Sequence, residues 1–84
     1  MKVYAVTISQ VSDYEDLGVR VELFKKYDDA VKYLKLWRDD ELRYVERDGY
    51  DIEEDDENIF VASLPMDWAR GHSEGYIEEK EINE

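Results

Sequence analysis

The sequence contains no cysteine, one proline and one histidine among its 84 residues. Without cysteine the chain can form no disulfide and offers no thiolate to a metal ion, which fits a reducing compartment. No hydrophobic run approaches the roughly 20 residues that a transmembrane helix needs. Met1 leads directly into a strand-like segment rather than into an apolar signal segment. We therefore expect a cytoplasmic protein with no membrane partner.

Sequence motifs of catalysis and cofactor binding are also missing. The chain has no nucleophile elbow, no glycine-rich phosphate loop and no HExxH pair. The single histidine, His72, lies close in sequence to Ser73 and Glu74, but a catalytic triad also requires an aligned nucleophile and oxyanion donors. Polar loops often reach this composition by chance. We predict that the protein is not an enzyme, needs no cofactor or metal, and exposes His72 in a loop.

Basic residues are scarce in the second half of the chain, and the formal net charge is −12. Residues 1–47 hold nine Lys and Arg against ten Asp and Glu, whereas residues 48–84 hold two against thirteen. A field of this sign repels nucleic acid and attracts basic proteins at low salt. We therefore expect that the protein does not bind nucleic acid directly and that its partner is a basic protein surface.

The residues that are abundant indicate a folded chain. Hydrophobic residues make up 43% of the sequence and aromatic residues 13%, which is too much for a disordered tail even with 40% charged residues. A chain of this length buries roughly 60% of its unfolded surface. The sequence therefore predicts one small domain that spans residues 1–84.

Two strands are predicted in the first quarter of the chain. Residues 2–10 are rich in β-branched and aromatic side chains, and residues 19–24 alternate between apolar and polar. The polar segment 12–18 between them predicts a hairpin. Tyr4, Val6 and Ile8 would share one face of the first strand. In the second strand we expect the side of Val19, Val21 and Leu23 to be the buried one.

A helix is predicted over about residues 28–48, with Asp28 or Asp29 as its N-cap and Gly49 in the left-handed position after its end. Tyr50 would then pack back on Val45 or Tyr44. One side of the helix carries a run of mostly apolar residues at helical spacing, namely Ala30, Leu34, Trp37, Glu41, Tyr44 and Val45. Glu41 interrupts this run. Glu41 is either exposed to solvent, because the helix extends past the sheet, or half-buried with a role in a site or an interface.

The remaining segments complete an α+β fold. Residues 58–64 predict a third strand that Pro65 ends, residues 66–75 have turn composition, and residues 76–82 predict a charged fourth strand at the sheet edge. The predicted order is ββαββ, with one helix packed on a four-stranded, mostly antiparallel sheet. The uncovered face would carry Val3, Ala5 and Thr7, or Ile59 and Val61, and it is a candidate homodimer interface.

The stretch YDIEEDDE, residues 50–57, carries six carboxylates and no basic residue. Its alternating acids are similar to the start of an EF-hand loop, but counting from Asp51 the required glycine and the final glutamate are replaced by Asp56 and Ala62. We therefore predict an acidic loop between the helix and the third strand. Its charge is either only solubilising or an imitation of a phosphate backbone.

The segment 66–72 adds residue types that are enriched at interaction hot spots, with Trp68 and Arg70 in a glycine-flanked loop. Trp68 would either cap the core or contact a partner. Together with the acids, these residues form the candidate partner-binding set: Asp51, Glu53, Glu54, Asp55, Asp56, Glu57, Trp68, Arg70, Glu74, Glu79 and Glu81. Because strand residues alternate, Glu79 and Glu81 would share one surface and Glu78 would lie on the other.

In size, charge and composition the chain resembles small phage and mobile-element proteins that inhibit host defence nucleases, among them anti-CRISPR proteins. This resemblance assigns no role to any single residue. It implies a non-enzymatic binding module that occupies a basic nucleic-acid-binding surface. The alternative is a homo-oligomeric accessory protein in which the apolar sheet face is the interface and the charge serves solubility.

Overall fold

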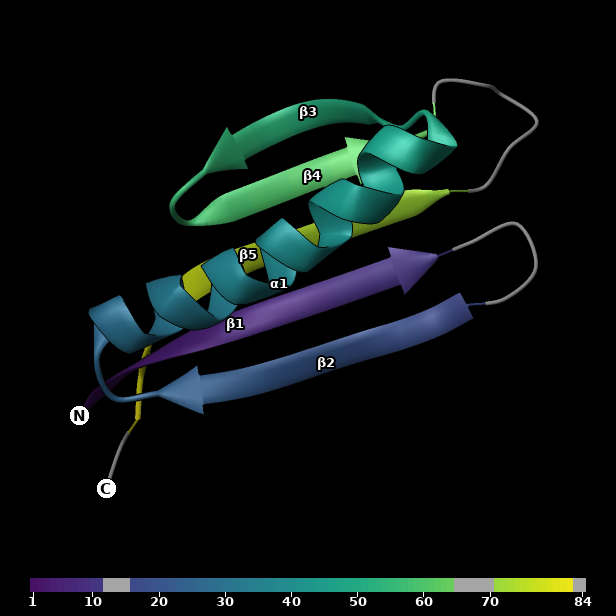
Figure 1. Ribbon diagram of the computed structural model, residues 1–84. Helices are drawn as coiled ribbons and strands as arrows, with labels where there is room; N and C mark the ends of the chain where they lie inside the picture. Colours follow the sequence, from purple (N-terminus) through teal and green to yellow (C-terminus); the bar gives the residue numbers. More distant parts are fainter. Residues whose placement is uncertain (12–15, 65–70, 83–84) are drawn as a thin grey trace.

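The protein is an α+β fold in which one helix covers one face of a five-stranded antiparallel sheet (Figure 1). A computed structural model describes residues 1–11, 16–64 and 71–82. The elements are β1 (Lys2–Val11), β2 (Asp16–Phe24), α1 (Tyr27–Asp48), β3 (Asp51–Asp56), β4 (Ile59–Ser63) and β5 (His72–Glu81). The strand order is β2-β1-β5-β4-β3. The predicted class and single helix are confirmed, but the predicted four strands are too few.

The fifth strand is β3, which lies in the acidic stretch that was predicted to be a loop. Its six residues are DIEEDD, a composition that rarely forms strands. They do so here because they pair antiparallel with β4, from Asp51 opposite Ser63 to Asp56 opposite Ile59. β3 lies at the sheet edge, so every one of its residues stays exposed and no carboxylate has to be buried. Backbone pairing therefore outweighs the weak local propensity.

β5 is longer than predicted and lies inside the sheet rather than at its edge. It begins at His72, and pairs with β1 along its whole length and with β4 over His72–Tyr76. The predicted turn over residues 72–75 is therefore wrong. Gly75 is part of the strand, and a glycine is needed there because α1 packs directly against its backbone. A Cβ atom at this position would lie 2.5 Å from Cζ3 of Trp37 and 2.8 Å from Cδ1 of Leu34.

α1 agrees with the predicted helix in extent and in its C-terminal end. Gly49 is left-handed with φ of 78°, and the N–H of Tyr50 donates to the carbonyl of Val45 at 3.0 Å. Tyr50 also packs beside Val45 in the core, as predicted. The N-cap prediction is wrong, because the cap residue is Lys26 and makes no side-chain capping bond. Asp28 and Asp29 lie in the first turn, where they face the positive end of the helix dipole.

The core lies between α1 and the sheet in two clusters. The first contains Val6, Ile8, Ala30 and Leu34, and the second contains Val45, Phe60 and Ala62. Trp37 packs against both clusters, so a single indole ring joins the two ends of the helix–sheet interface. Among the described residues, no helix is long and apolar enough to cross a membrane.

The face of the sheet away from α1 carries apolar residues of two kinds. Val3, Ala5 and Val61 are buried there, beside long cross-strand side chains: Lys80 for Val3, Leu23 and Glu78 for Ala5, and Glu54 and Glu74 for Val61. On β2, by contrast, Val19, Val21 and Leu23 are 64%, 55% and 58% exposed. The prediction that this side of β2 would be buried is wrong. Arg20 and Glu22 pair with Ile8 and Val6, so they take the side that faces the helix layer.

Candidate protein-interaction surface

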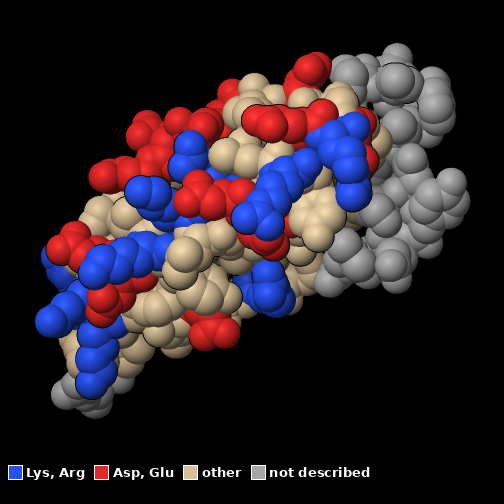
Figure 2. All heavy atoms as spheres, viewed as in Figure 1, with Lys and Arg blue, Asp and Glu red and all other residues tan. Residues whose placement is uncertain are grey.

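A continuous acidic ridge follows the β3 edge of the sheet. We define the acidic ridge as the six carboxylates between residues 51 and 57: Asp51, Glu53, Glu54, Asp55, Asp56 and Glu57. All six residues are exposed, five of them on the edge strand and the last in the turn to β4. Figure 2 shows acidic atoms gathered along the side of the molecule where β3 lies, with most of the visible basic atoms over α1 and the opposite side. The structure thus gathers the sequence-predicted acids of this stretch on one edge.

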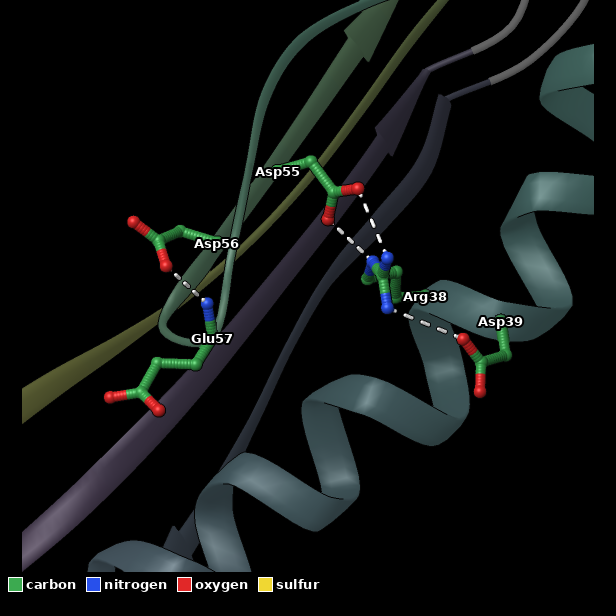
Figure 3. Close-up of polar contacts among 5 residues, drawn as sticks. All are labelled: Arg38, Asp39, Asp55, Asp56 and Glu57. Atoms are coloured by element: carbon green, nitrogen blue, oxygen red, sulfur yellow. Dashed lines mark hydrogen bonds and ion pairs between the residues drawn. The ribbon is translucent and has the colours of Figure 1, made fainter.

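One basic residue is bound to this ridge. Arg38 of α1 donates from Nε and Nη2 to the two carboxylate oxygens of Asp55, with an Nη2–Oδ2 distance of 3.0 Å (Figure 3). The hydrogen bond to Asp55 raises the pKa of Arg38 above its ordinary value. A second contact joins Arg38 Nη1 to Asp39 at 3.4 Å. Because a planar guanidinium bound through two nitrogens is a directional link, it fixes the position of β3 relative to the helix.

The turn that ends the ridge is tied to the start of the helix. The hydroxyl of Tyr27 donates to Oε1 of Glu57 at 3.1 Å, and the N–H of Glu57 donates to Oδ1 of Asp56 at 2.9 Å. Burial raises the pKa of Tyr27 above its ordinary value, and the hydrogen bond to Glu57 and its negative charge act in the same direction. The aromatic ring of Tyr27 meets that of Tyr4 edge to face at 5.5 Å between centroids. The C-terminal end of the ridge is therefore linked to α1 at two points, Asp55 and Glu57.

The other ridge carboxylates are directed away from the helix. Glu53 accepts a hydrogen bond from Oγ of Ser63 at 2.7 Å, next to a register irregularity between Ile52 and Glu54. Asp51 and Glu54 make no side-chain hydrogen bond or ion pair with any part of the chain that the structure describes. Within the described residues, Arg38 is the one basic residue that forms an ion pair with the ridge. The ridge therefore keeps most of its negative charge available to another molecule.

A groove separates β3 from the helix. Its volume is about 410 Å³, and its lining combines two apolar residues of α1, two basic residues of α1 and three ridge acids: Val31, Leu34, Lys35, Arg38, Asp55, Asp56 and Glu57. α1 packs over β1, β5, β2 and β4, and it reaches β3 through the Arg38–Asp55 pair. The groove forms because α1 does not lie directly over β3. It offers aliphatic surface beside carboxylates, which suits the long aliphatic stem and charged head of a lysine or arginine.

The predicted acids of β5 do not all join the ridge. Glu74 lies on the face away from the helix, in one cross-strand row with Val61 and Glu54, so it extends the ridge across that face. Glu79 and Glu81 share one face of the strand, as predicted, and it is the helix side; Glu78 faces the other side. They lie on the part of β5 that extends beyond its pairing with β4. There Glu79 pairs with Lys2 at 3.5 Å and Glu81 with the N-terminal ammonium at 3.2 Å.

The loop candidates have different outcomes. Trp68 and Arg70 lie outside the described residues, so their predicted roles stay predictions. His72 begins β5 instead of lying in a loop, and its Nε2 is 3.4 Å from Oε2 of Glu74. Ser73 points to the opposite face of the strand from His72 and donates its hydroxyl to Glu41. These two neighbours are therefore not arranged as a base and its nucleophile.

A second polar cluster surrounds Glu41, the carboxylate that interrupts the apolar side of the helix. Oε1 accepts a bond from Nε2 of Gln10 at 2.6 Å, and Oε2 accepts one from Oγ of Ser73 at 3.0 Å. Glu41 is half-buried rather than wet, since it is partly covered and held by β1 and β5, and its predicted role in a site stays a prediction. An adjoining hollow of about 390 Å³ is lined also by Arg20, Trp37, Tyr44 and Tyr50. Sequence reasoning singled out Glu41 but missed Gln10 and Ser73, which are 31 and 32 positions away.

The acids are not arranged as a metal site. In residues 1–11, 16–64 and 71–82, no three Asp, Glu or His side chains are grouped in a way that could hold an ion. Comparison of the chain with family models, with curated proteins and with solved structures finds no match. The functional argument therefore rests on the surface itself.

Proposed function

We propose that this protein is a non-enzymatic binding module whose acidic ridge docks on a basic surface of another protein, of the kind that binds nucleic acid. The observation that carries the proposal is the edge strand β3, where five of six residues are carboxylates, all are exposed, and one basic residue is bound to them. Occupying such a surface would exclude its nucleic acid, so the module would act as a competitive inhibitor.

The charge spacing of the ridge supports this proposal. Six strand residues extend over about 20 Å. Without Asp55, whose charge Arg38 neutralises, four carboxylates place one negative charge roughly every 5 Å. One strand of B-DNA carries a phosphate about every 3.4 Å of helix axis. A groove that binds phosphates with lysines and arginines would meet a similar linear charge on β3. The strand is also held by its ladder with β4 and by Arg38, which reduces the ordering cost of binding.

The groove beside the ridge gives the partner's basic side chains a place to insert. A lysine or arginine could lay its aliphatic stem on Val31 and direct its head towards Asp56 and Glu57. Phage and mobile-element inhibitors of host nucleases, which the chain resembles in size and charge, would need a surface of this kind. The protein's charge asymmetry is in keeping with that role.

Two matched charge variants test the proposal. Asp51→Asn with Glu54→Gln removes two ridge charges that take part in no described hydrogen bond or ion pair. Asp40→Asn with Glu46→Gln removes the same charge from exposed positions of α1. The immobilised protein should capture basic nucleic-acid-binding proteins from an extract of its source. We expect the ridge variant to lose most of this binding and the helix variant to keep it.

Competition and salt complete the test. A double-stranded DNA oligonucleotide should release the captured protein, because both ligands would occupy one surface. Raising the salt to about 0.5 M should do the same, since the Debye length then falls to a few Å. Binding that persists unchanged at this salt, or that both variants weaken equally, would contradict the proposal.

A further inference from the structure

The second edge of the sheet, β2, has a character opposite to that of the acidic ridge. No described strand pairs with the outer side of β2, which lies open along the lower side of Figure 1. Exposed sheet edges are normally protected by like charges, proline or irregularities, because unpaired backbone groups can pair with another chain. β3 is protected by its acids. On β2, residues 19–23 are Val-Arg-Val-Glu-Leu, which present apolar side chains on one face and one charge of each sign on the other.

This five-residue segment is complementary to itself when the second copy runs antiparallel. In a register centred on Val21, residues 19 to 23 of one copy lie opposite residues 23 to 19 of the other, so that the two residue numbers of each pair sum to 42. Arg20 then lies opposite the partner's Glu22, and Glu22 lies opposite the partner's Arg20. On the face away from the helices, Val19 and Leu23 meet the partner's Leu23 and Val19 on either side of the Val21 pair. Opposite-charge and apolar cross-strand pairs of this kind are the stabilising ones in antiparallel sheets.

The neighbouring registers lack this complementarity. A shift by two residues in one direction places Arg20 opposite the partner's Arg20, and the shift in the other direction places Glu22 opposite the partner's Glu22. A shift by one residue places charged side chains on the face of the apolar ones. Neither Arg20 nor Glu22 forms an ion pair with another described residue. The charges and the alternation thus select one register.

The net charge of the molecule does not oppose this contact strongly. The acidic ridge is at the far edge of the sheet, separated from β2 by β1, β5 and β4. Four spacings of about 4.8 Å place it roughly 19 Å away, which is more than twice the Debye length at physiological salt. A copy that approached through β3 instead would place carboxylates opposite carboxylates. The β2 edge is therefore where a second copy of this chain fits best.

We infer that two copies of this protein join through β2 as a symmetric antiparallel pair centred on Val21. The result is a ten-stranded sheet, five strands from each copy, with both helices on one face and an acidic ridge at each outer end. The two-fold axis uses both β2 edges and leaves only charged edges, so the assembly closes as a dimer. This inference is independent of the proposed function, since it assigns no role to the ridge.

Charge reversal tests the register. Arg20→Glu and Glu22→Arg each place like charges in both symmetric pairs, and each should weaken self-association about tenfold or more. An equimolar mixture of the two variants restores opposite charges and should form heterodimers at least as well as the unaltered protein. Arg43→Glu on the exposed side of α1 is the matched control and should leave dimerisation unchanged. Sedimentation velocity at up to about 0.5 mM protein measures the self-association of the two variants, their mixture and the control.

The absence of native cysteine allows a second, independent test. Residues directly opposite in an antiparallel ladder have Cα atoms about 4.5–5.5 Å apart, within the range that a disulfide spans. Val21→Cys should therefore give a covalent dimer under mild oxidation, whereas Leu36→Cys, 73% exposed on the helix, should give little. A strictly monomeric unaltered protein at about 0.5 mM would overturn the dimer. A dimer that Arg20→Glu and Glu22→Arg alone leave unaffected, and that Val21→Cys does not cross-link, would overturn this edge as its interface.

Discussion

The carboxylate of Glu41 shows how a single residue connects the helix to the sheet. Both of its oxygens accept hydrogen bonds, one from Gln10 of β1 and one from Ser73 of β5. Ser73 is 6% exposed, and it is the buried polar residue among the described ones. Its hydroxyl depends on Glu41, since a buried donor that loses its acceptor keeps the full cost of losing water. Glu41 therefore has a structural role whether or not the adjoining hollow binds anything.

Replacing Glu41 tests that dependence. Glu41→Ala leaves Gln10 and Ser73 without their acceptor and should lower the free energy of unfolding by about 1–3 kcal/mol. Glu41→Gln should cost less, since the amide oxygen still accepts one bond. Urea unfolding followed by circular dichroism measures both. Glu46→Ala is the control, because Glu46 is exposed on the same helix and should stay within about 0.5 kcal/mol of the unaltered protein. Equal effects of the two alanine variants would contradict the role assigned to Glu41.

At the scale of the elements, the sequence predicted those whose pattern is local. The helix and its glycine end, the first hairpin and β4 follow from hydrophobic spacing and turn residues. β3 could not be predicted from its own sequence because Asp and Glu disfavour strands. It is a strand because its backbone pairs with β4. The full length of β5 was missed because Gly75 indicated a turn, whereas it provides room for Trp37. The Gln10–Glu41–Ser73 cluster depends on contacts distant in sequence, which no local pattern encodes.

Packing of α1 on β5 gives a prediction at this scale. Gly75→Ala would place a methyl group within 2.5 Å of the Trp37 ring and 2.8 Å of Leu34. Over-packing of this kind should lower the free energy of unfolding by about 1–3 kcal/mol, or the melting temperature by roughly 4–8 °C per kcal/mol for a domain of this size. Thermal unfolding measures the change.

A second substitution shows whether crowding is the cause. Leu34→Ala removes one of the two contacted side chains, so the double variant should be less destabilised than the sum of the single ones. Strict additivity would show that the methyl group does not meet Leu34, and it would contradict the close approach of helix and strand at Gly75.

For the molecule as a whole, charge is distributed along an elongated body of 46 × 20 × 16 Å. The chain has 23 acidic and 11 basic residues, so most carboxylates have no opposite charge available. We expect their mutual repulsion to disfavour the compact state more than the few surface ion pairs favour it. The proposed partner and the inferred second copy use different edges of this body, and a dimer would present two ridges in opposite directions.

Salt should therefore stabilise the protein. Raising NaCl from about 0.02 M to about 0.5 M shortens the Debye length to a few Å, and the melting temperature should rise by several degrees. Asp51→Asn with Glu54→Gln should raise the melting temperature at low salt and reduce its dependence on salt. Differential scanning calorimetry measures both effects. A melting temperature that falls with salt would show that ion pairs such as Arg38–Asp55 outweigh the repulsion.

The way β3 is attached has a consequence for local opening. None of its six side chains is buried, its backbone pairs with β4 alone, and two side-chain links join its acidic end and the following turn to α1. β3 can thus detach without taking a buried side chain out of the core, whereas the removal of β1 or β5 would remove core residues. Its amide hydrogens should exchange with solvent through sub-global fluctuations at a fraction of the global free energy. The segment in which carboxylates are most concentrated is also the part of the molecule whose folding is most nearly independent of the rest.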